Sequence, residues 1–356
     1  MSDNGRLGFG GVLVGLGLGW IIFNAINVTS GLFSWVMILS GSVLILSTLF
    51  FRGRETRNVK RLSNGLMIGL LVSLLVASGN NNFVGPVFSA DLGAYRAQET
   101  RSFSGALTTG RVLLDVNSFN GLITVSTWDR QEYSITVLVK ARGVTDADAE
   151  KNLDRFELDL DEGPLGGRTR LVLGHNTPQS WTSKYSLQVE ARLPTGATVD
   201  LDLDSSNGAI SLTDIRGGAV DLRTSNGRVD LDHVTAGRAE VSTSNGDVEG
   251  VLDAPDARVD TSNGGIELRL PCTVSGRYVL RTSNAAVDIT VPDLSGVGYD
   301  VDASTSNAYV EIDLDGLVYS LNQKNSKEAR TEGFVDRDVR ITLEIETSNG
   351  GVKVGP

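Results

Sequence analysis

The chain has 356 residues with one Cys and two His, and its net charge is −11. A single Cys excludes an intrachain disulfide and any Cys-based metal site, and two distant His residues give no metal-ligand cluster and no catalytic pair. Residues 196–356 carry 27 acidic against 14 basic side chains. A surface this acidic argues against a nucleic-acid partner and against direct contact with anionic lipid headgroups.

Uncharged, apolar segments near the N-terminus predict an integral membrane region over residues 1–88. Each reaches about 20 residues, which at ~1.5 Å per residue crosses a bilayer as a helix. The three predicted spans cover about 7–28, 31–51 and 65–85. The first contains glycines four residues apart, on a face where another helix can pack closely; these are Gly11, Gly15 and Gly19.

A strongly basic loop, residues 52–64, separates the second and third predicted spans. Short basic loops between spans stay on the cytoplasmic side, which places everything after the third span outside the cytoplasm. A nucleic-acid or lipid-binding tract is the alternative, and a tight loop between helices suits it less. We therefore predict a multi-pass protein of the cell membrane. The basic residues are Arg52, Arg54, Arg57, Lys60 and Arg61.

The next two segments are less regular. Residues 89–112 are polar and mixed in composition, which indicates a linker. Residues 113–196 predict an irregular β region that starts and caps a larger β domain, with a short helix near 146–154 whose N-cap is Thr145. Terminal units of a stacked β structure need such shielding of their edges.

One phrase, T-S-N-G, then recurs about every 20 residues over residues 197–356, and a fixed period of this length is typical of a repeat architecture. The first copy reads S-S-N-G, and two copies have Ala in place of Gly. The repeated asparagines are Asn207, Asn226, Asn245, Asn263, Asn284, Asn307 and Asn349. The threonines two residues earlier are Thr224, Thr243, Thr261, Thr282, Thr305 and Thr347.

Apolar residues alternate with polar ones on both sides of each copy, as in V-x-L-x-T-S-N-G-x-V-x-L, which predicts strands with one buried side. Asn-Gly often marks a hairpin, but the even spacing favours a β-solenoid: an all-β, parallel β-helix-like stack of ~20-residue coils. We expect the Thr and Asn side chains to face inward and to form a structural ladder along the stack. The alternative is that Asn only forms the turns.

The last copy of the repeat, with Asn349 at its corner, lies almost at the end of the chain. The polar segment 320–335 interrupts the repeat before it and predicts a surface loop or a degenerate coil. With nothing to cap it, the last coil is expected to leave an exposed edge through which two molecules can associate.

The run from about 113 to 354 resembles the prokaryotic putative-adhesin family of β-strand-repeat domains. The resemblance rests on N-G-x-I-x-V-x-x-W-D at 120–129, the acidic helical segment, L-P-x-G at 193–196 and the repeated S-N-G-x-V-x-L. It implies a surface-exposed β-solenoid and no catalytic residue. The predicted membrane spans lie outside it and resemble no family.

Three functions are therefore weighed. The leading hypothesis is a non-catalytic adhesion, surface-binding or envelope-structural role with no cofactor. An envelope-stress sensor and a polysaccharide-acting β-helix enzyme are the alternatives; the latter lacks a run of aromatic residues for sugar stacking. Outward aspartates could also recruit Ca²⁺, although a merely solvated acidic face is favoured: Asp202, Asp221, Asp230, Asp232, Asp302 and Asp313.

Overall fold

The computed structural model describes residues 94–107, 109–177 and 179–356, and these fall in one compact unit, Ala94–Pro356. In this part of the chain no helix is long and apolar enough to cross a membrane. The predicted spans, their three glycines and the basic loop lie outside the described residues, so their placement stays a prediction.

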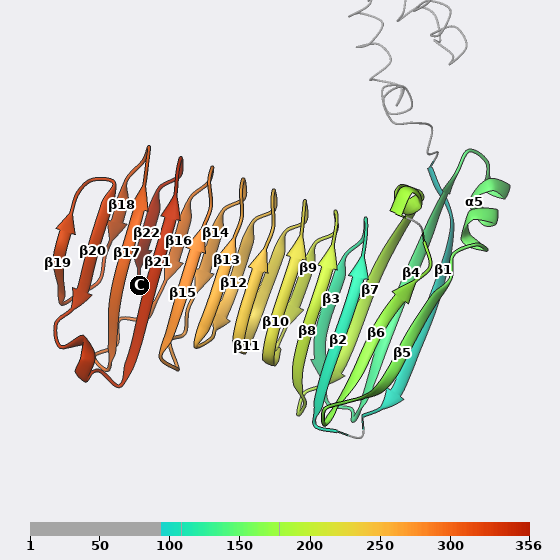
Figure 1. Cartoon of the computed structure of the whole chain (residues 1–356), viewed down its shortest axis with the longest axis horizontal. Helices are drawn as coiled ribbons and strands as arrows, with labels where there is room; N and C mark the ends of the chain where they lie inside the picture. The colour runs from blue at the N-terminus through green and yellow to red at the C-terminus, as the bar shows by residue number, and fades with distance from the viewer. Residues whose placement is uncertain (1–93, 108, 178) are drawn as a thin grey trace, which may run out of the picture. The chain divides into compact units, whose positions relative to one another are not determined.

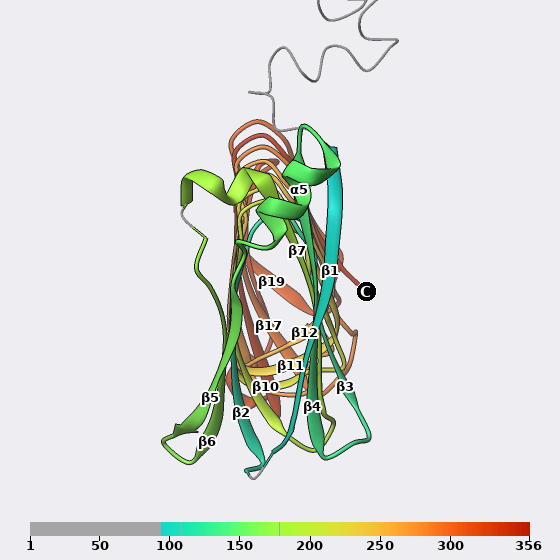
Figure 2. The ribbon, with the colours of Figure 1, turned by 90° about the vertical axis from the view of Figure 1, so that its right-hand side faces the viewer.

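The unit is a two-faced β-solenoid (Figure 1). Its strands form two layers, which Figure 2 shows side by side, and the alternating apolar residues of both layers point into the space between them. We call the layers face 1 and face 2. The strands of face 1 are, in spatial order, β5 (Leu158–Leu165), β6 (Arg168–His175), β2 (Arg111–Ser118), β8 (Thr198–Ser205), β10 (Arg216–Thr224), the second half of β11 (Val229–Ser242), β13 (Asp256–Asp260), β15 (Gly276–Arg281), β21 (Val339–Thr347), β17 (Val297–Thr305), β20 (Ser326–Thr331) and β19 (Leu317–Asn322).

The strands of face 2 also follow one another along the stack. They are β1 (Ala94–Ala106), β4 (Glu132–Gly143), β7 (Tyr185–Pro194), β3 (Ile123–Trp128), β9 (Ile210–Thr213), the first half of β11, β12 (Val248–Asp253), β14 (Ile266–Arg269), β16 (Val287–Thr290), β22 (Val352–Gly355) and β18 (Val310–Ile312). Strand β11 belongs to both faces because it runs on through the corner that joins them.

In the middle of the solenoid all pairing is parallel, and apart from shifts near Gly217 and Leu231 it is in register, so equivalent side chains of successive coils stack on one another. On face 1 one stack of equivalent inward side chains is fully buried. Because every coil contributes one residue to this stack, the apolar alternation persists in the sequence of every coil. The stack contains Leu203, Leu222, Val241, Val259, Leu280, Ile345 and Ala303.

The order of coils in space differs from their order in the sequence at both ends. The first coil, β2 with β3, lies between the coil β6–β7 and the coil β8–β9. The last coil, β21 with β22, lies between the coil β15–β16 and the coil β17–β18. Both terminal coils are therefore paired on two sides, and the expectation that the final coil presents an open edge is wrong.

Antiparallel strands close both ends of the solenoid. Strand β1 pairs with β4, and β5 pairs with β6, so most of the segment 89–112 that was predicted to be a linker is in fact strand. At the other end β19 and β20 form a hairpin that extends face 1. The prediction of a loop or degenerate coil over 320–335 is thus wrong: its polar composition is that of a capping hairpin whose outward side chains meet solvent.

Helical structure is sparse among the described residues. Helix α5 (Asp146–Leu153) follows β4, and Thr145 caps it through a reciprocal capping box with Asp148. The short 3₁₀ turns η1 (Gln179–Lys184) and η2 (Phe334–Asp336) lie before β7 and between β20 and β21. The short helix therefore lies where the sequence places it.

Candidate functional site

Threonine hydroxyls form the inner row of the T-S-N-G corner. The hydroxyl of Thr261 donates to the carbonyl oxygen of Gly246 in the preceding coil at 3.2 Å and accepts the N–H of Gly264 in its own coil at 3.2 Å. The same two bonds recur at Thr224 and Thr243. These hydroxyls are buried, so each satisfies two backbone groups that water does not reach. This explains why a hydroxyl side chain, Thr in six copies and Ser205 in the first, precedes Asn by two residues.

Glycine follows Asn because the coils approach each other closely there. A Cβ on Gly264 would lie 1.8 Å from the carbonyl oxygen of Gly246, and one on Gly227 would lie 1.9 Å from that of Gly208. Ala occupies the equivalent position at 285 and 308, and among the described residues neither Ala N–H donates to its Thr hydroxyl. The corner thus tolerates a methyl group where it gives up this bond.

Asparagine amides form the outer row of the same corner. Each Nδ2 donates to the Oδ1 of the Asn in the preceding coil of the stack at 2.6 to 2.8 Å. The spatial order follows the inserted coil rather than the sequence, since Asn349 lies between Asn284 and Asn307. The row therefore runs Asn120, Asn207, Asn226, Asn245, Asn263, Asn284, Asn349, Asn307.

Two features of this row differ from the expectation. The asparagines are exposed, so the prediction that they face inward is wrong: the strand ends at Thr, and the turn that follows reverses the alternation. Asn120 was missed as the first member, although its own Asn-Gly pair was visible in the sequence. It has a φ of 53° and donates to the carbonyls of Thr182 and Tyr185, which fixes the start of the row.

The six aspartates considered for Ca²⁺ do not share one row. Asp202 and Asp221 are neighbours on face 1, whereas Asp230 lies on face 2. Asp302 lies on face 1 near the far end, beside Glu344 and Glu328. Across the described residues no group of three or more His, Cys, Asp or Glu side chains is arranged to hold a metal ion.

Many outward charges are instead paired across strands. Arg223 bridges Asp202 and Asp221, and Arg277 binds Glu344 with two hydrogen bonds of 2.8 Å. These pairs are largely exposed, and each is worth about 0–1 kcal/mol. They order the side chains of the outer surface more than they stabilise the fold.

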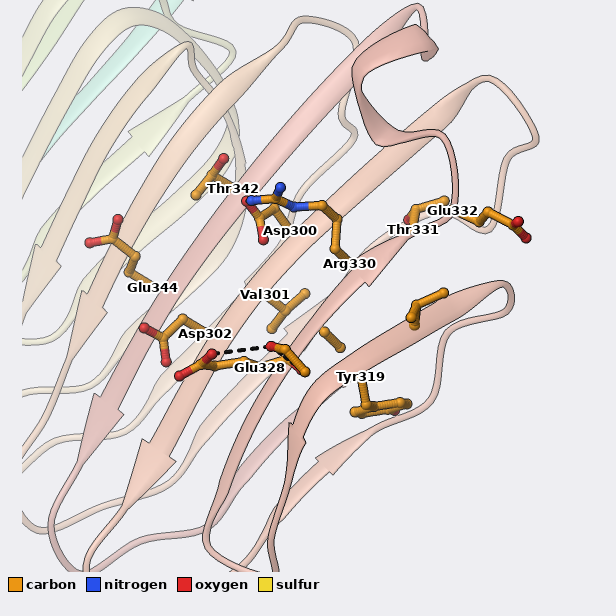
Figure 3. Close-up of a pocket in the computed structure, with 13 residues that line it drawn as sticks. Asp300, Val301, Asp302, Tyr319, Glu328, Arg330, Thr331, Glu332, Thr342 and Glu344 are labelled. Atoms are coloured by element: carbon orange, nitrogen blue, oxygen red, sulfur yellow. Dashed lines mark hydrogen bonds and ion pairs between the residues drawn. The ribbon is translucent and has the colours of Figure 1, made fainter.

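The candidate site is a hollow of about 650 Å³ on the outer side of face 1, where the β19–β20 hairpin extends the sheet (Figure 3). Carboxylates from three neighbouring strands line it: Glu344 from β21, Asp302 from β17 and Glu328 from β20. Val318 of β19 gives it an exposed apolar wall. The site therefore combines negative charge with an apolar surface.

Electrostatics in the hollow centre on Asp302. Its burial, and then the negative charges of Glu328 and Glu344, raise the pKa of Asp302 above its ordinary value. Asp300, by contrast, is paired with Arg330, and Glu328 accepts a hydrogen bond from Ser320 at 3.1 Å. Within the described residues the side chain of Asp302 makes no hydrogen bond or ion pair. A cationic group placed here would relieve that repulsion.

Sequence comparison matches the β domain to a protein family. The family model described as Toastrack DUF4097 matches residues 114–355, more than half of the chain. A search of the curated proteins found no match.

Solved structures that match this chain include three from bacteria. A putative cell adhesion protein from Clostridium sporogenes shares 9% identity at a TM-score of 0.35, over 73% of this chain and 99% of that one. A putative adhesin from Bacteroides fragilis shares 9% identity at a TM-score of 0.31, over 74% and 100%. One from Parabacteroides distasonis shares 10% at 0.31, over 72% and 97%. Likeness this distant says nothing of function.

Proposed function

The chain belongs to the Toastrack DUF4097 family, and from that premise we propose that it is a non-catalytic adhesion or surface-binding protein. In this proposal the N-terminal apolar segments anchor it in the membrane and the solenoid stands outside the cytoplasm. The partner surface is one that presents basic groups to the hollow on face 1.

The observation that carries the proposal is the composition of the hollow. Its carboxylates come from adjacent strands of one continuous sheet, so backbone register places them near one another, although Glu344 is also paired with Arg277. Asp302 stays without a counter-charge there, next to the apolar wall of Val318, which is 60% exposed. The aliphatic stem of a Lys or Arg side chain would cover that wall while its charge meets the carboxylates.

A rigid body suits such a role. Antiparallel strands end the stack on both sides, and the Thr and Asn rows fix one corner of the repeated coils, so the outward side chains keep their spacing. A preorganised surface loses less conformational entropy when it binds. The solenoid therefore provides positioning, and the outward side chains provide recognition.

The test of the site measures binding of a fluorescent hexa-arginine peptide to the full chain in detergent, by anisotropy. Removing the three carboxylates of the hollow (Asp302→Asn, Glu328→Gln, Glu344→Gln) is expected to weaken binding about 10-fold or more. A matched variant removes the same charge from face 2 at Asp230, Glu249 and Glu267. Equal losses in both variants would show that the peptide senses only net charge, and the hollow would be dismissed.

The test of topology uses intact cells. Protease added outside is expected to cut within the chain beyond residue 90 and to leave the loop 52–64 intact. Protection of the solenoid together with cleavage of that loop would reverse the orientation, and the adhesion role would fall with it.

A further inference from the structure

Strand β1 is the longest edge of the solenoid. It has 13 residues and pairs with β4 on one side only, whereas the other edge strands β5, β19 and β18 have 8, 6 and 3 residues. A long edge strand is a template for pairing with another chain. Self-association, expected from the sequence at the C-terminal coil, therefore has its best structural basis at the opposite end.

The edge of β18 is covered where that of β1 is open. The N–H of Val310 donates to the carbonyl of Lys324 at 2.9 Å, and the hydroxyl of Tyr319 lies 3.4 Å from the carbonyl of Ile312. The capping hairpin thus occupies the outward backbone groups of that short strand. Helix α5 contacts β1, with an ion pair between Arg96 and Asp146 near the start of the strand, but among the described residues no strand pairs with the outward edge of β1.

The register of β1 shows which of its backbone groups are free. The N–H of Leu107 bonds the carbonyl of Gln131, and the pairing with β4 continues without a shift from there back to Ala97. Odd-numbered residues therefore bond β4, because bonded and non-bonded positions alternate in an antiparallel pair. The backbone groups of Gln98, Thr100 and Ser102 point away from the sheet.

Glu99 and Arg101 form an ion pair at 2.9 Å within β1, and the same two charges favour one register of self-pairing over its immediate neighbours. In an antiparallel pair centred on Thr100, Glu99 lies opposite Arg101 of the second copy, and Arg101 lies opposite its Glu99. Centring the pair on Glu99 or on Arg101 would set like charges against each other, which is destabilising. Centring on Thr100 also brings Gln98 opposite Ser102, so all three outward-pointing residues bond at once.

We propose that β1 is a homophilic contact: two copies of this chain pair antiparallel about Thr100, and face 2 of one copy continues into face 2 of the other. The bulge between Tyr95 and Ala97 confines regular pairing to about 97–103. Within that stretch about six backbone hydrogen bonds form, two for each bonded pair. The charged residues that would normally protect an edge here permit one register and reject its neighbours.

The pairing has a consequence for adhesion that rests on the proposed function. Antiparallel strands place the Ala94 of one copy and that of the other at opposite ends of the pair, about 40 Å apart at ~3.4 Å per residue. Chains that enter the solenoid at Ala94 from a membrane therefore arrive from opposite sides. Two anchored copies paired in this way join two surfaces.

Crosslinking of the full chain in detergent tests the register. Thr100→Cys faces itself across the two-fold axis at a Cα–Cα distance of about 5.5 Å, which a disulfide spans. Under mild oxidation it is expected to form covalent dimers at least 10-fold faster than Ser104→Cys, whose counterpart lies at position 96. The native Cys272 is buried and serves as the unreacted background. Equal rates for the two variants overturn the proposal.

Charge reversal in the Thr100→Cys background gives the second arm. Glu99→Arg is expected to slow crosslinking about 10-fold because it sets Arg against Arg, and adding Arg101→Glu is expected to restore it. Failure of the double reversal to restore the rate overturns the register even if each protein is well folded.

A liposome-clustering experiment tests the β1 contact and the joining of opposed membranes separately. Two batches of liposomes that carry the full chain and different dyes are expected to cluster, and Glu99→Arg is expected to abolish clustering. Crosslinking in detergent without any clustering would retain the β1 contact and overturn the joining of opposed surfaces. Clustering that Glu99→Arg leaves unchanged would point to adhesion through another surface and would overturn the β1 contact.

Discussion

The inner and outer rows of the T-S-N-G corner repeat together with every coil, yet they differ in environment. The Thr hydroxyls are buried between backbone groups that have no other partner, while the Asn amides lie in water and bond mainly to each other. Burial decides the cost of losing a hydrogen bond, because an exposed group regains water and a buried one does not. The inner row should therefore carry most of the stability.

Among the variants that test this comparison, Gly264→Ala is expected to lose the most stability. Its methyl group would overlap the carbonyl of Gly246, so the corner must shift and lose the bond from the Gly264 N–H to Thr261. We expect a loss of about 2–4 kcal/mol, seen as a lower midpoint of thermal unfolding by far-UV circular dichroism. The matched control is Gly265→Ala, whose methyl group meets only ordinary contacts at 3.6 Å and beyond. A similar loss in both variants would mean that close approach does not explain the glycine.

Thr261→Val should be the next largest change. Val keeps the shape of Thr, but it leaves the carbonyl of Gly246 and the N–H of Gly264 without their partner. The expected loss is about 2 kcal/mol, measured in the same way. Thr261→Ser keeps the hydroxyl, as Ser205 does in the first copy of the repeat, where it accepts the N–H of Gly208 at 3.0 Å. Ser should therefore cost less than Val; the opposite order would place the stabilisation in the methyl group.

Asn263→Ala probes the outer row and should cost less, about 0.5–1 kcal/mol. It removes the bonds that Asn263 donates to Asn245 and to the carbonyl of Ser244 and the bond it accepts from Asn284, all of which water can replace. Asn263→Asp still accepts from Asn284 but sets a carboxylate oxygen against the Oδ1 of Asn245, so it should cost at least as much as Ala. If Ala at this position is as damaging as Val at Thr261, the outer row is the main support of the stack and the comparison is reversed.

Asp302→Asn should give the smallest effect, and in the opposite direction. Because the pKa of Asp302 is raised in the folded state, stability falls as pH rises through that pKa. Removing the charge should slightly raise the unfolding midpoint at pH 7, and the gain should disappear in acid, where the native carboxyl is protonated in both states. Unfolding midpoints of both proteins between pH 3 and pH 8 measure this. A gain that persists in acid would assign the effect to packing.

The same contrast shows what alternation in a sequence can predict. Thr224 and the apolar residues before it lie in one strand, so their inward placement follows from the period of two. Asn226 follows the end of that strand, and a turn does not preserve the period, so its outward placement could not be predicted in this way. The hollow on face 1 was missed for a related reason: it needs the β19–β20 hairpin, whose turn and second strand are polar and resemble a loop in the sequence.

The chain by itself determined its all-β character, the period of its coils and the residues that repeat at each corner, because these depend on local side-chain chemistry. Only the tertiary structure decided that the first and last coils lie inside the stack, that hairpin and edge strands close the ends, and that β1 is left with a free edge. These depend on backbone pairing between distant segments, and backbone hydrogen bonds are the same for every sequence. Which strands meet is therefore settled by the packing of the whole domain.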